Sequence, residues 1–247
     1  MSTVFVIWWL IMKNIFFDTI PSTNLYLKEN YETLENMTVI CARHQTEGRG
    51  RNNRKWVDGN DLLFSILIKN DLELATNYSL LIAYSIRKVL SKHLNDVTIK
   101  WPNDIMVYDY KVCGILLEAV TKNKIECVII GVGINTNTES FSEELKVKAN
   151  SLKNLLDTEI DNQKLLLEIE EEFEKDLELL STNIYIKEIN KYFYLQDKPV
   201  EFAYEGKEQK GIVLKMNNDG SIAIKTEKEI ININYGEVSL SKSYKVK

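Results

Sequence analysis

The chain has 247 residues, 45% of them hydrophobic, and a formal net charge of −5. This length accommodates one sizeable core plus a small second unit, and the composition is that of an ordinary soluble globular protein. The acidic balance argues against general nucleic-acid binding through bulk charge.

The N-terminal segment contains a continuous apolar run at 4–12. The run is too short to cross a bilayer, and its first cation, Lys13, follows it instead of preceding it as in a signal peptide. We therefore expect no targeting role and no membrane contact. A strand is predicted at 14–18, and residues 1–11 are interpreted as an extension from an upstream start.

Apolar runs at 39–43 and 62–68 predict two buried strands, which are joined by a basic loop and a turn at 58–61. The thiols of the chain lie among apolar neighbours, without CxxC spacing and in an odd number: Cys41, Cys113 and Cys127. This pattern favours buried thiols in a reducing cytoplasm over disulfides or a metal site. With only His44 and His93 available, a histidine-rich metal site is disfavoured as well.

Helical spacing of apolar residues predicts a helix over 77–94, followed by a short strand at 97–100 that Pro102 ends. Apolar runs at 114–120 and 125–133 predict a hairpin, because a polar four-residue segment joins them.

A second amphipathic helix is predicted over 163–180, with its many glutamates on a solvated face. The remaining chain shows short alternating strands separated by Gly- and Asn-containing turns, at 199–204, 210–216, 221–226 and 229–235. They predict a small barrel after a boundary near 190–196, with domains at 1–193 and 194–247. Taken alone, such a barrel is typical of an interaction module.

The basic loop carries two glycines and four cations, in the order Glu47-Gly48-Arg49-Gly50-Arg51-Asn52-Asn53-Arg54-Lys55-Trp56. Glycine allows close backbone approach, arginine offers a planar fork that matches phosphate, and an indole gives a face for stacking. The loop is suited to an anion, although a solvated basic surface is the commoner meaning of such a pattern.

Other polar positions each have two interpretations. Lys111, before an apolar run, is either a cation directed into a pocket or a solvated turn lysine. Asn103 and Asp104 suit either an Asx turn or a ligand site with Mg²⁺, and Ser22 suits either a helix cap or a hydrogen-bonding site. Gly131 and Gly133 indicate close strand packing or a bulge and do not make a dinucleotide fingerprint.

Four of these segments together resemble the motifs of the biotin protein ligases, which read GRGRxGRxW, KWPND, KxxGIL and GxGxN. The matching segments are the basic loop, Lys100-Trp101-Pro102-Asn103-Asp104, Lys111-Val112-Cys113-Gly114-Ile115-Leu116 and Gly131-Val132-Gly133-Ile134-Asn135. The resemblance runs from about Phe16 to the C-terminus. It departs at Asn53, where the family has glycine, and we expect asparagine to tolerate the left-handed backbone that a glycine allows there.

The resemblance implies a set of site residues. Those implied to bind biotin are Ser22, Thr23, Asn24, Gln45, Gly48, Arg49, Gly50, Arg51, Lys111 and Gly114. Those implied to bind ATP are Arg51, Arg54, Trp56, Asn103, Asp104, Lys111 and Asn135, with Trp56 near the adenine and Asp104 as a contact for Mg²⁺. Lys111, Arg49 and Arg51 are the implied catalytic residues.

The resemblance also implies an α+β fold, in which a mixed-sheet catalytic domain of the class II aminoacyl-tRNA synthetase and biotin ligase type precedes an SH3-like barrel. The implied reaction joins biotin to a biotin carboxyl carrier protein through biotinyl-5′-AMP, with ATP and Mg²⁺, and a homodimer is compatible with it. A lipoate or octanoate ligase and a non-catalytic binding module are the alternatives. A ligase–repressor is not expected, because only some 15 residues precede Phe16, too few for a helix-turn-helix that binds DNA.

Overall fold

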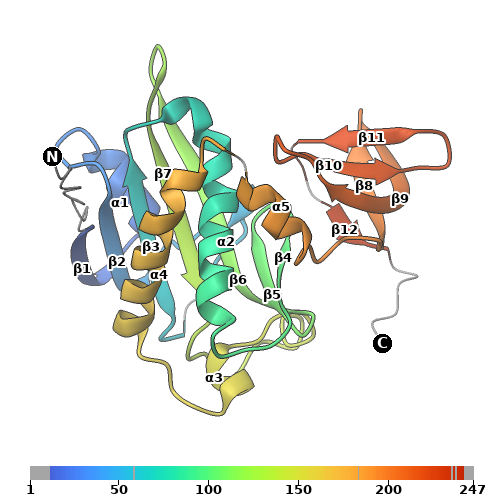
Figure 1. The fold of residues 1–247 in the computed structure, drawn as a ribbon. Helices are drawn as coiled ribbons and strands as arrows, with labels where there is room; N and C mark the ends of the chain where they lie inside the picture. Colours follow the sequence, from blue (N-terminus) through green and yellow to red (C-terminus); the bar gives the residue numbers. More distant parts are fainter. Residues whose placement is uncertain (1–11, 58, 183, 235, 237, 242–247) are drawn as a thin grey trace, which may run out of the picture.

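Two β-sheets organise the chain in the computed structural model (Figure 1), which describes residues 12–57, 59–182, 184–234, 236 and 238–241. The interpretation of residues 1–11 lies outside the described residues. The larger sheet has seven strands in the order β1 (Lys13–Ile20), β2 (Thr38–Gln45), β3 (Leu62–Ile68), β7 (Ile125–Ile134), β6 (Tyr110–Thr121), β5 (Asp104–Val107) and β4 (Val97–Lys100). It is mixed, because β1 runs parallel to β2 whereas the other neighbours are antiparallel.

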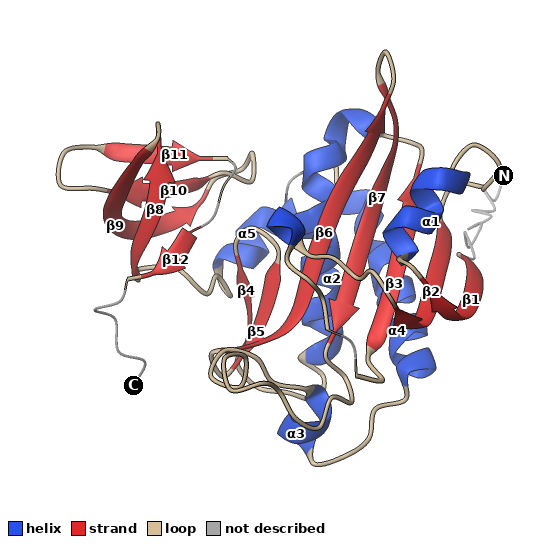
Figure 2. Cartoon of the chain, turned by 180° about the vertical axis from the view of Figure 1, so that it is seen from behind, coloured by secondary structure: helices blue, strands red, loops and turns tan. Residues whose placement is uncertain are grey.

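Helices lie on both faces of this sheet. On one face α2 (Tyr78–Leu90) and α4 (Asn162–Asp176) cover the main core, to which α5 (Ile184–Asn190) adds. Figure 2 looks onto the opposite face, where α1 (Thr23–Asn30) lies in front of the sheet. The period of two along β3 explains this division, since Phe64 and Ile66 face the main core whereas Leu67 packs under α1. Ser65 therefore lies on the α1 face.

The C-terminal sheet is antiparallel, in the order β11 (Ile230–Ile233), β10 (Ile222–Lys225), β9 (Lys207–Met216), β8 (Pro199–Tyr204) and β12 (Val238–Leu240). Its architecture is consistent with the SH3-like barrel that the sequence predicts. The segment before this sheet is bound to β4 by a 2.9 Å hydrogen bond from Tyr194 N to the Ile99 carbonyl, and a 3.0 Å hydrogen bond from Trp101 Nε1 to the Gly220 carbonyl, in the turn between β9 and β10, joins the two sheets directly.

The predicted strands at 62–68, 97–100 and 199–204 are confirmed with their predicted bounds. Other predicted strands are extended or shortened at their ends, and β9 begins at Lys207 because the turn before it needs only Glu205 and Gly206, both with positive φ. The predicted burial of the three thiols is confirmed as well.

Both long helices end earlier than predicted. Helix α2 stops at Leu90 and is capped by Ser91, whose backbone N–H and hydroxyl both donate to the Arg87 carbonyl, at 3.0 and 2.7 Å. Helix α4 passes into a short 3-10 turn, η3 (Leu177–Leu179). The sequence missed β5, β12, α5 and α3 (Leu152–Leu156), each too short for a periodic pattern. Two further 3-10 turns are η1 (Arg51–Asn53) and η2 (Leu72–Asn77), and no described helix is long and apolar enough to cross a membrane.

The expectation that the α4 glutamates are all solvated is wrong. Glu170 is 6% exposed and accepts a 3.1 Å hydrogen bond from Asn14 Nδ2 on β1, while Glu172 pairs with Lys88 on α2. The sequence pattern could not show this, because the partners come from other elements. Burial, with a smaller contribution from Glu174, raises the pKa of Glu170 to about 7.

Because of this raised pKa, we predict that the contribution of Glu170 to the stability of the fold depends on pH. The folded protein favours the protonated carboxyl, so its contribution to stability falls as the pH rises from 4.5, the ordinary value, to about 7. The Glu170→Gln variant carries no such charge. We expect it to be more stable than the parent by up to about 3 kcal/mol at pH 8, and by less than about 1 kcal/mol at pH 5. Urea unfolding of both proteins at both pH values measures this difference, and an equal difference at pH 5 and pH 8 contradicts it.

Candidate functional site

The candidate site lies on the α1 face of the large sheet. Its base consists of strand backbone without side chains, at three glycines that we call the glycine floor: Gly114, Gly131 and Gly133. Gly131 and Gly133 lie two residues apart on β7 and therefore on the same face of the sheet, and Gly114 on β6 is paired with Gly133. A Cβ atom at Gly131 would lie 2.2 Å from Asn24 Oδ1, and one at Gly133 would lie 2.7 Å from the Trp56 ring. The close-packing interpretation of these glycines is confirmed, because the absence of side chains lets Asn24 and Trp56 reach the sheet.

The basic loop folds back on itself beside this floor. Its backbone is closed by hydrogen bonds from Gly50 N to the Arg54 carbonyl at 2.7 Å and from Trp56 N to the Gly48 carbonyl at 2.9 Å. The sequence led us to expect left-handed backbone at Asn53. Within η1 the left-handed residue is instead its neighbour Asn52, with φ 55°. The loop therefore has an internal framework that orients its cations.

The loop arginines point to different partners. Arg51 donates to Asn103 Oδ1 at 3.4 Å and, more closely, to the carbonyl of Gly236, which lies between β11 and β12, at 2.6 Å. Arg49 pairs with Glu47 at 3.4 Å and is largely exposed. The structure thus brings Arg51 to the KWPND segment and leaves Arg49 outside that cluster.

Lys111 lies within β6, because the strand begins one residue earlier than this lysine and not at Gly114 as the sequence suggested. Two left-handed residues, Tyr108 and Asp109, make the preceding turn. The Lys111 ammonium lies 2.7 Å from Asp104 Oδ1, and 3.0 Å from a Cβ atom built at Gly114. The side chain is therefore directed over the glycine floor, which disfavours the solvated turn lysine.

Trp56 forms the wall above Gly133 and Gly114. The Lys111 ammonium lies 5.7 Å from its ring centroid, within the range of a cation–π contact. Its indole Nε1 is buried and has no hydrogen-bond partner among the described residues. A buried donor without a partner is costly, and a ligand acceptor would satisfy it.

Asn103 and Asp104 bring two cations together, because Asn103 contacts Arg51 and the next residue, Asp104, contacts Lys111. Asn103 is itself fixed to β6, because its amide donates to the Ile115 carbonyl and its own carbonyl accepts from Ile115 N at 2.9 Å. The Asx-type local role and the ligand-site role are compatible here. The arrangement can bind an anion such as a phosphate group.

Asn135 is 6% exposed and occupied by structural contacts. Its backbone N–H donates to the Val112 carbonyl at 2.8 Å, and its amide donates to the Asn150 carbonyl at 3.2 Å. This residue therefore holds the segment after β7 against the sheet, next to the glycine floor.

Polar side chains of α1 make the other half of the site. Ser22 caps the helix by accepting from Leu25 N at 3.5 Å, and the Thr23 N–H donates to Gln45 Oε1 at 2.7 Å. Asn24 Nδ2 donates to Glu118 Oε2 at 2.7 Å, and Ser65 Oγ lies 2.6 Å from Asn24 Oδ1. The cap interpretation of Ser22 is confirmed, and Thr23, Asn24 and Gln45 are brought together.

Ser65 and Glu118 were missed by the sequence reasoning as site residues. Each carried a signal, since Ser65 is the one hydroxyl in an apolar strand and Glu118 is the one charged residue within the apolar run at 114–120. Neither signal shows which residues they meet.

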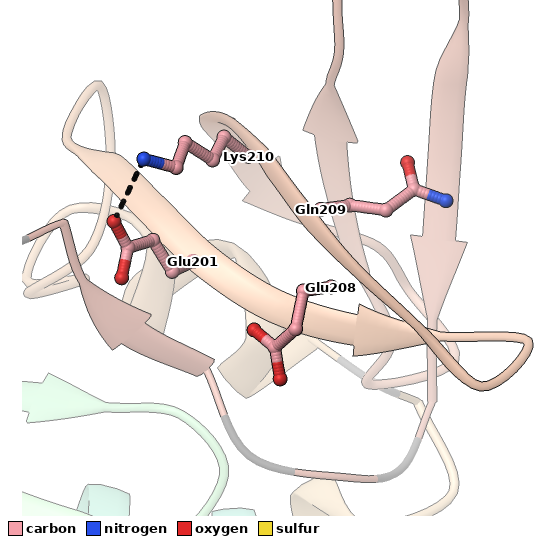
Figure 3. A pocket seen from close by; sticks show the side chains of 4 residues that line it. All are labelled: Glu201, Glu208, Gln209 and Lys210. Carbon is pink, nitrogen blue, oxygen red and sulfur yellow. Dashed lines mark ion pairs between the residues drawn. The ribbon is translucent and has the colours of Figure 1, made fainter.

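Two surface hollows lie away from this cluster. One, of about 290 Å³, is lined by Glu201, Glu208, Gln209 and Lys210 on β8 and β9, where Lys210 pairs with Glu201 at 3.2 Å (Figure 3). The other, of about 510 Å³, has Gly59, Asn137 and Lys153 among its lining residues. Neither contains the residues that the motifs single out.

The chain is similar to several known proteins. The model of the Biotin/lipoate A/B protein ligase family matches residues 16–135. Bifunctional ligase/repressor BirA of Bacillus spizizenii is 35% identical over 173 residues, which are 65% of this chain and 52% of the relative. Its namesake in Escherichia coli is 28% identical over 235 residues, 92% of this chain and 73% of the relative. The chain thus spans about half the length of the Bacillus relative.

Among solved structures, a biotin protein ligase from Aquifex aeolicus in complex with biotin and ATP superposes with a TM-score of 0.82. It is 27% identical, and the match covers 94% of this chain and 99% of that one. The predicted α+β fold with a mixed sheet is therefore confirmed.

Proposed function

We propose that this chain is a biotin protein ligase, because the model of the biotin/lipoate A/B protein ligase family matches its residues 16–135. The observation that carries the proposal is the meeting of Arg51 and Lys111 on Asn103 and Asp104, over a glycine floor whose other end is lined by Thr23 and other polar side chains. Such a site offers cations for phosphate beside hydrogen-bonding groups for a polar ring. The solved Aquifex aeolicus relative holds biotin and ATP, which are the ligands that this division of the site suits.

The reaction proceeds in two steps. In the first, a biotin carboxylate oxygen attacks the α-phosphorus of ATP, and the bond to pyrophosphate breaks, giving biotinyl-5′-AMP. In the second, the ε-amine of a carrier lysine attacks the carbonyl carbon, AMP leaves, and the amine loses a proton. The amide so formed links biotin to the carrier.

The cations act mainly in the first step. A carboxylate is a poor acylating agent, and adenylation gives its carbonyl a good leaving group. Lys111 and Arg51 offset the charge that gathers on the α-phosphate and pyrophosphate oxygens, and the Trp56 wall excludes water from the mixed anhydride. We place Arg49 and Arg54, with Gly48 and Gly50, in the same loop that closes over the ligands.

Mg²⁺ enters as part of the substrate MgATP. Asp104 is a suitable carboxylate, since Mg²⁺ bound with ATP takes one or two carboxylates in addition to phosphate oxygens. Its Oδ1 lies 2.7 Å from the Lys111 ammonium, so a metal would have to share this carboxylate with the lysine.

The proposed partner is a biotin carboxyl carrier protein, which supplies the acceptor lysine. The proposed domains are 1–193 for catalysis and 194–247 for the SH3-like unit. The cytoplasm is the proposed compartment, and a homodimer is compatible with the proposal.

The decisive experiment is biotin-dependent exchange of pyrophosphate into ATP. Purified protein with Mg²⁺ and ATP should show exchange with biotin and little with lipoate, because lipoate has no ureido group to pair with the polar side chains near Thr23. Equal rates with the two acids would instead favour a ligase of broader specificity. No exchange with either would favour the non-catalytic binding module.

A further inference from the structure

A row of four polar side chains crosses the α1 face of the sheet, in the spatial order Thr23, Ser65, Asn24 and Glu118. Ser65 Oγ lies 2.6 Å from both Thr23 Oγ1 and Asn24 Oδ1, and Asn24 Nδ2 lies 2.7 Å from Glu118 Oε2. Thr23, Asn24 and Ser65 are 3%, 7% and 0% exposed. We call these four residues the polar row.

The carboxylate at one end determines the direction of every hydrogen bond in the polar row. A carboxylate accepts and does not donate, so the NH₂ group of Asn24 must face Glu118 and its Oδ1 must face Ser65. A carbonyl oxygen cannot donate, so the single Ser65 proton goes to Asn24. In its other short contact Ser65 Oγ must therefore be the acceptor, so the Thr23 hydroxyl donates its proton to Ser65.

This direction makes Thr23 an acceptor toward the site. Thr23 Oγ1 also lies 3.2 Å from Gln45 Oε1, which already accepts the Thr23 backbone N–H at 2.7 Å. Because the Thr23 hydroxyl donates its proton to Ser65, Thr23 Oγ1 and Gln45 Oε1 form a pair of neighbouring acceptors. Such a pair is complementary to an N–H donor.

We propose that Glu118, acting through Asn24 and Ser65, fixes the Thr23 hydroxyl as a hydrogen-bond acceptor and so selects a ligand that presents a ring N–H at this point. The inference rests on the proposed function, under which the donor is a ureido N–H of biotin. Glu118 and Ser65 are positioning residues, since they act on the ligand only through Thr23 and Asn24. The charged end of the row is thus a specificity determinant.

The Glu118→Gln variant tests the direction of the row. A glutamine amide can donate to Asn24 Oδ1, which allows the row to reverse and lets Thr23 donate its proton to Gln45. The acceptor pair is then lost while side-chain shape is kept. Biotin affinity measured by calorimetry should fall roughly tenfold or more, as for one lost buried hydrogen bond, while KM for ATP stays within about twofold.

A second ligand separates this role from a merely structural one. Wild-type protein should bind biotin far more tightly than a biotin analogue methylated on its ureido nitrogens, which has no N–H to donate. In Glu118→Gln this ratio should shrink, because the variant no longer requires a donor. A structural role for Glu118 would weaken the binding of both ligands equally and leave the ratio unchanged.

Lys28→Ala provides the matched control. The Lys28 ammonium lies 4.0 Å from Glu118 Oε1, with about half of its side chain exposed, so this change removes a charge partner and keeps the row. Biotin affinity should be unchanged. If thermal melting shows that Glu118→Gln does not fold, Ser65→Ala interrupts the same row and should shrink the same ratio.

The outcomes separate the two proposals. Absence of biotin-dependent pyrophosphate exchange in the wild-type protein overturns the proposed function and this inference with it. Exchange in the wild-type protein, with an unchanged ligand ratio in folded Glu118→Gln or Ser65→Ala, overturns the inference alone.

Discussion

Replacing Lys111 by alanine is expected to slow formation of biotinyl-5′-AMP by about two to three orders of magnitude, as for the loss of one electrostatic donor in a preorganised site. The Lys111 ammonium lies 2.7 Å from Asp104 and beside the Trp56 ring, where it can face the oxygens that gain charge as pyrophosphate leaves. The rate of biotin-dependent pyrophosphate exchange measures this effect.

The fold should tolerate the Lys111 substitution. The side chain is 35% exposed, and a partly exposed ion pair contributes less than about 1 kcal/mol to stability. Lys153→Ala is the matched control, because Lys153 is 32% exposed and makes an ion pair of the same length with Glu139 away from the site. If the activity of Lys111→Ala stayed within a few-fold of the parent, Lys111 would have no catalytic role and would be an ordinary surface lysine.

Replacing Arg51 by glycine is expected to release the adenylate from the enzyme. The substitution removes the contacts to Asn103 Oδ1 and to the Gly236 carbonyl, and it adds backbone freedom to η1. The closed loop should be less populated after the first step, with dissociation of the intermediate at least about tenfold faster, as for a lost charge-assisted hydrogen bond. Biotin activation should persist in part.

Escape of the adenylate has a visible consequence. The mixed anhydride acylates amines without the enzyme, so Arg51→Gly should label lysines on bystander proteins. Blotting for biotin on an added non-carrier protein detects this labelling, and Arg51→Lys, which keeps the charge and loses the planar fork, should be intermediate. Arg43→Ala is the control, because Arg43 is 70% exposed and pairs loosely with Asp18. A variant that retained its adenylate as long as the parent would move the closing role to Arg49 or Arg54.

Local patterns in the sequence determined most of the framework. The strand at 62–68 was predicted with its observed bounds, because a continuous apolar run needs no information from elsewhere in the chain. Two apolar runs and a polar turn also predicted the hairpin of β6 and β7, although β6 begins at Tyr110 and not at Gly114. The motif order also determined the candidate site, through the resemblance to the biotin protein ligases.

The site's contacts, in contrast, depend on strand register. Asn24 meets Glu118 across 94 residues of sequence, and Asn14 meets Glu170 across 156. No local period links such pairs, so a glutamate that fits a solvated helix face was found buried. Likewise, Gly131 and Gly133 indicated close packing, but only the face on which they lie shows that Asn24 and Trp56 fill the space.

The sequence by itself thus determined which residues are apolar, which can bend and which carry charge. The tertiary structure decided which of them meet, because sheet register and the packing of α1 against β3 and β7 set the distances between side chains that the chain keeps far apart. Hydrogen-bond direction in the polar row depends on these distances, since each donor needs an acceptor within about 3 Å.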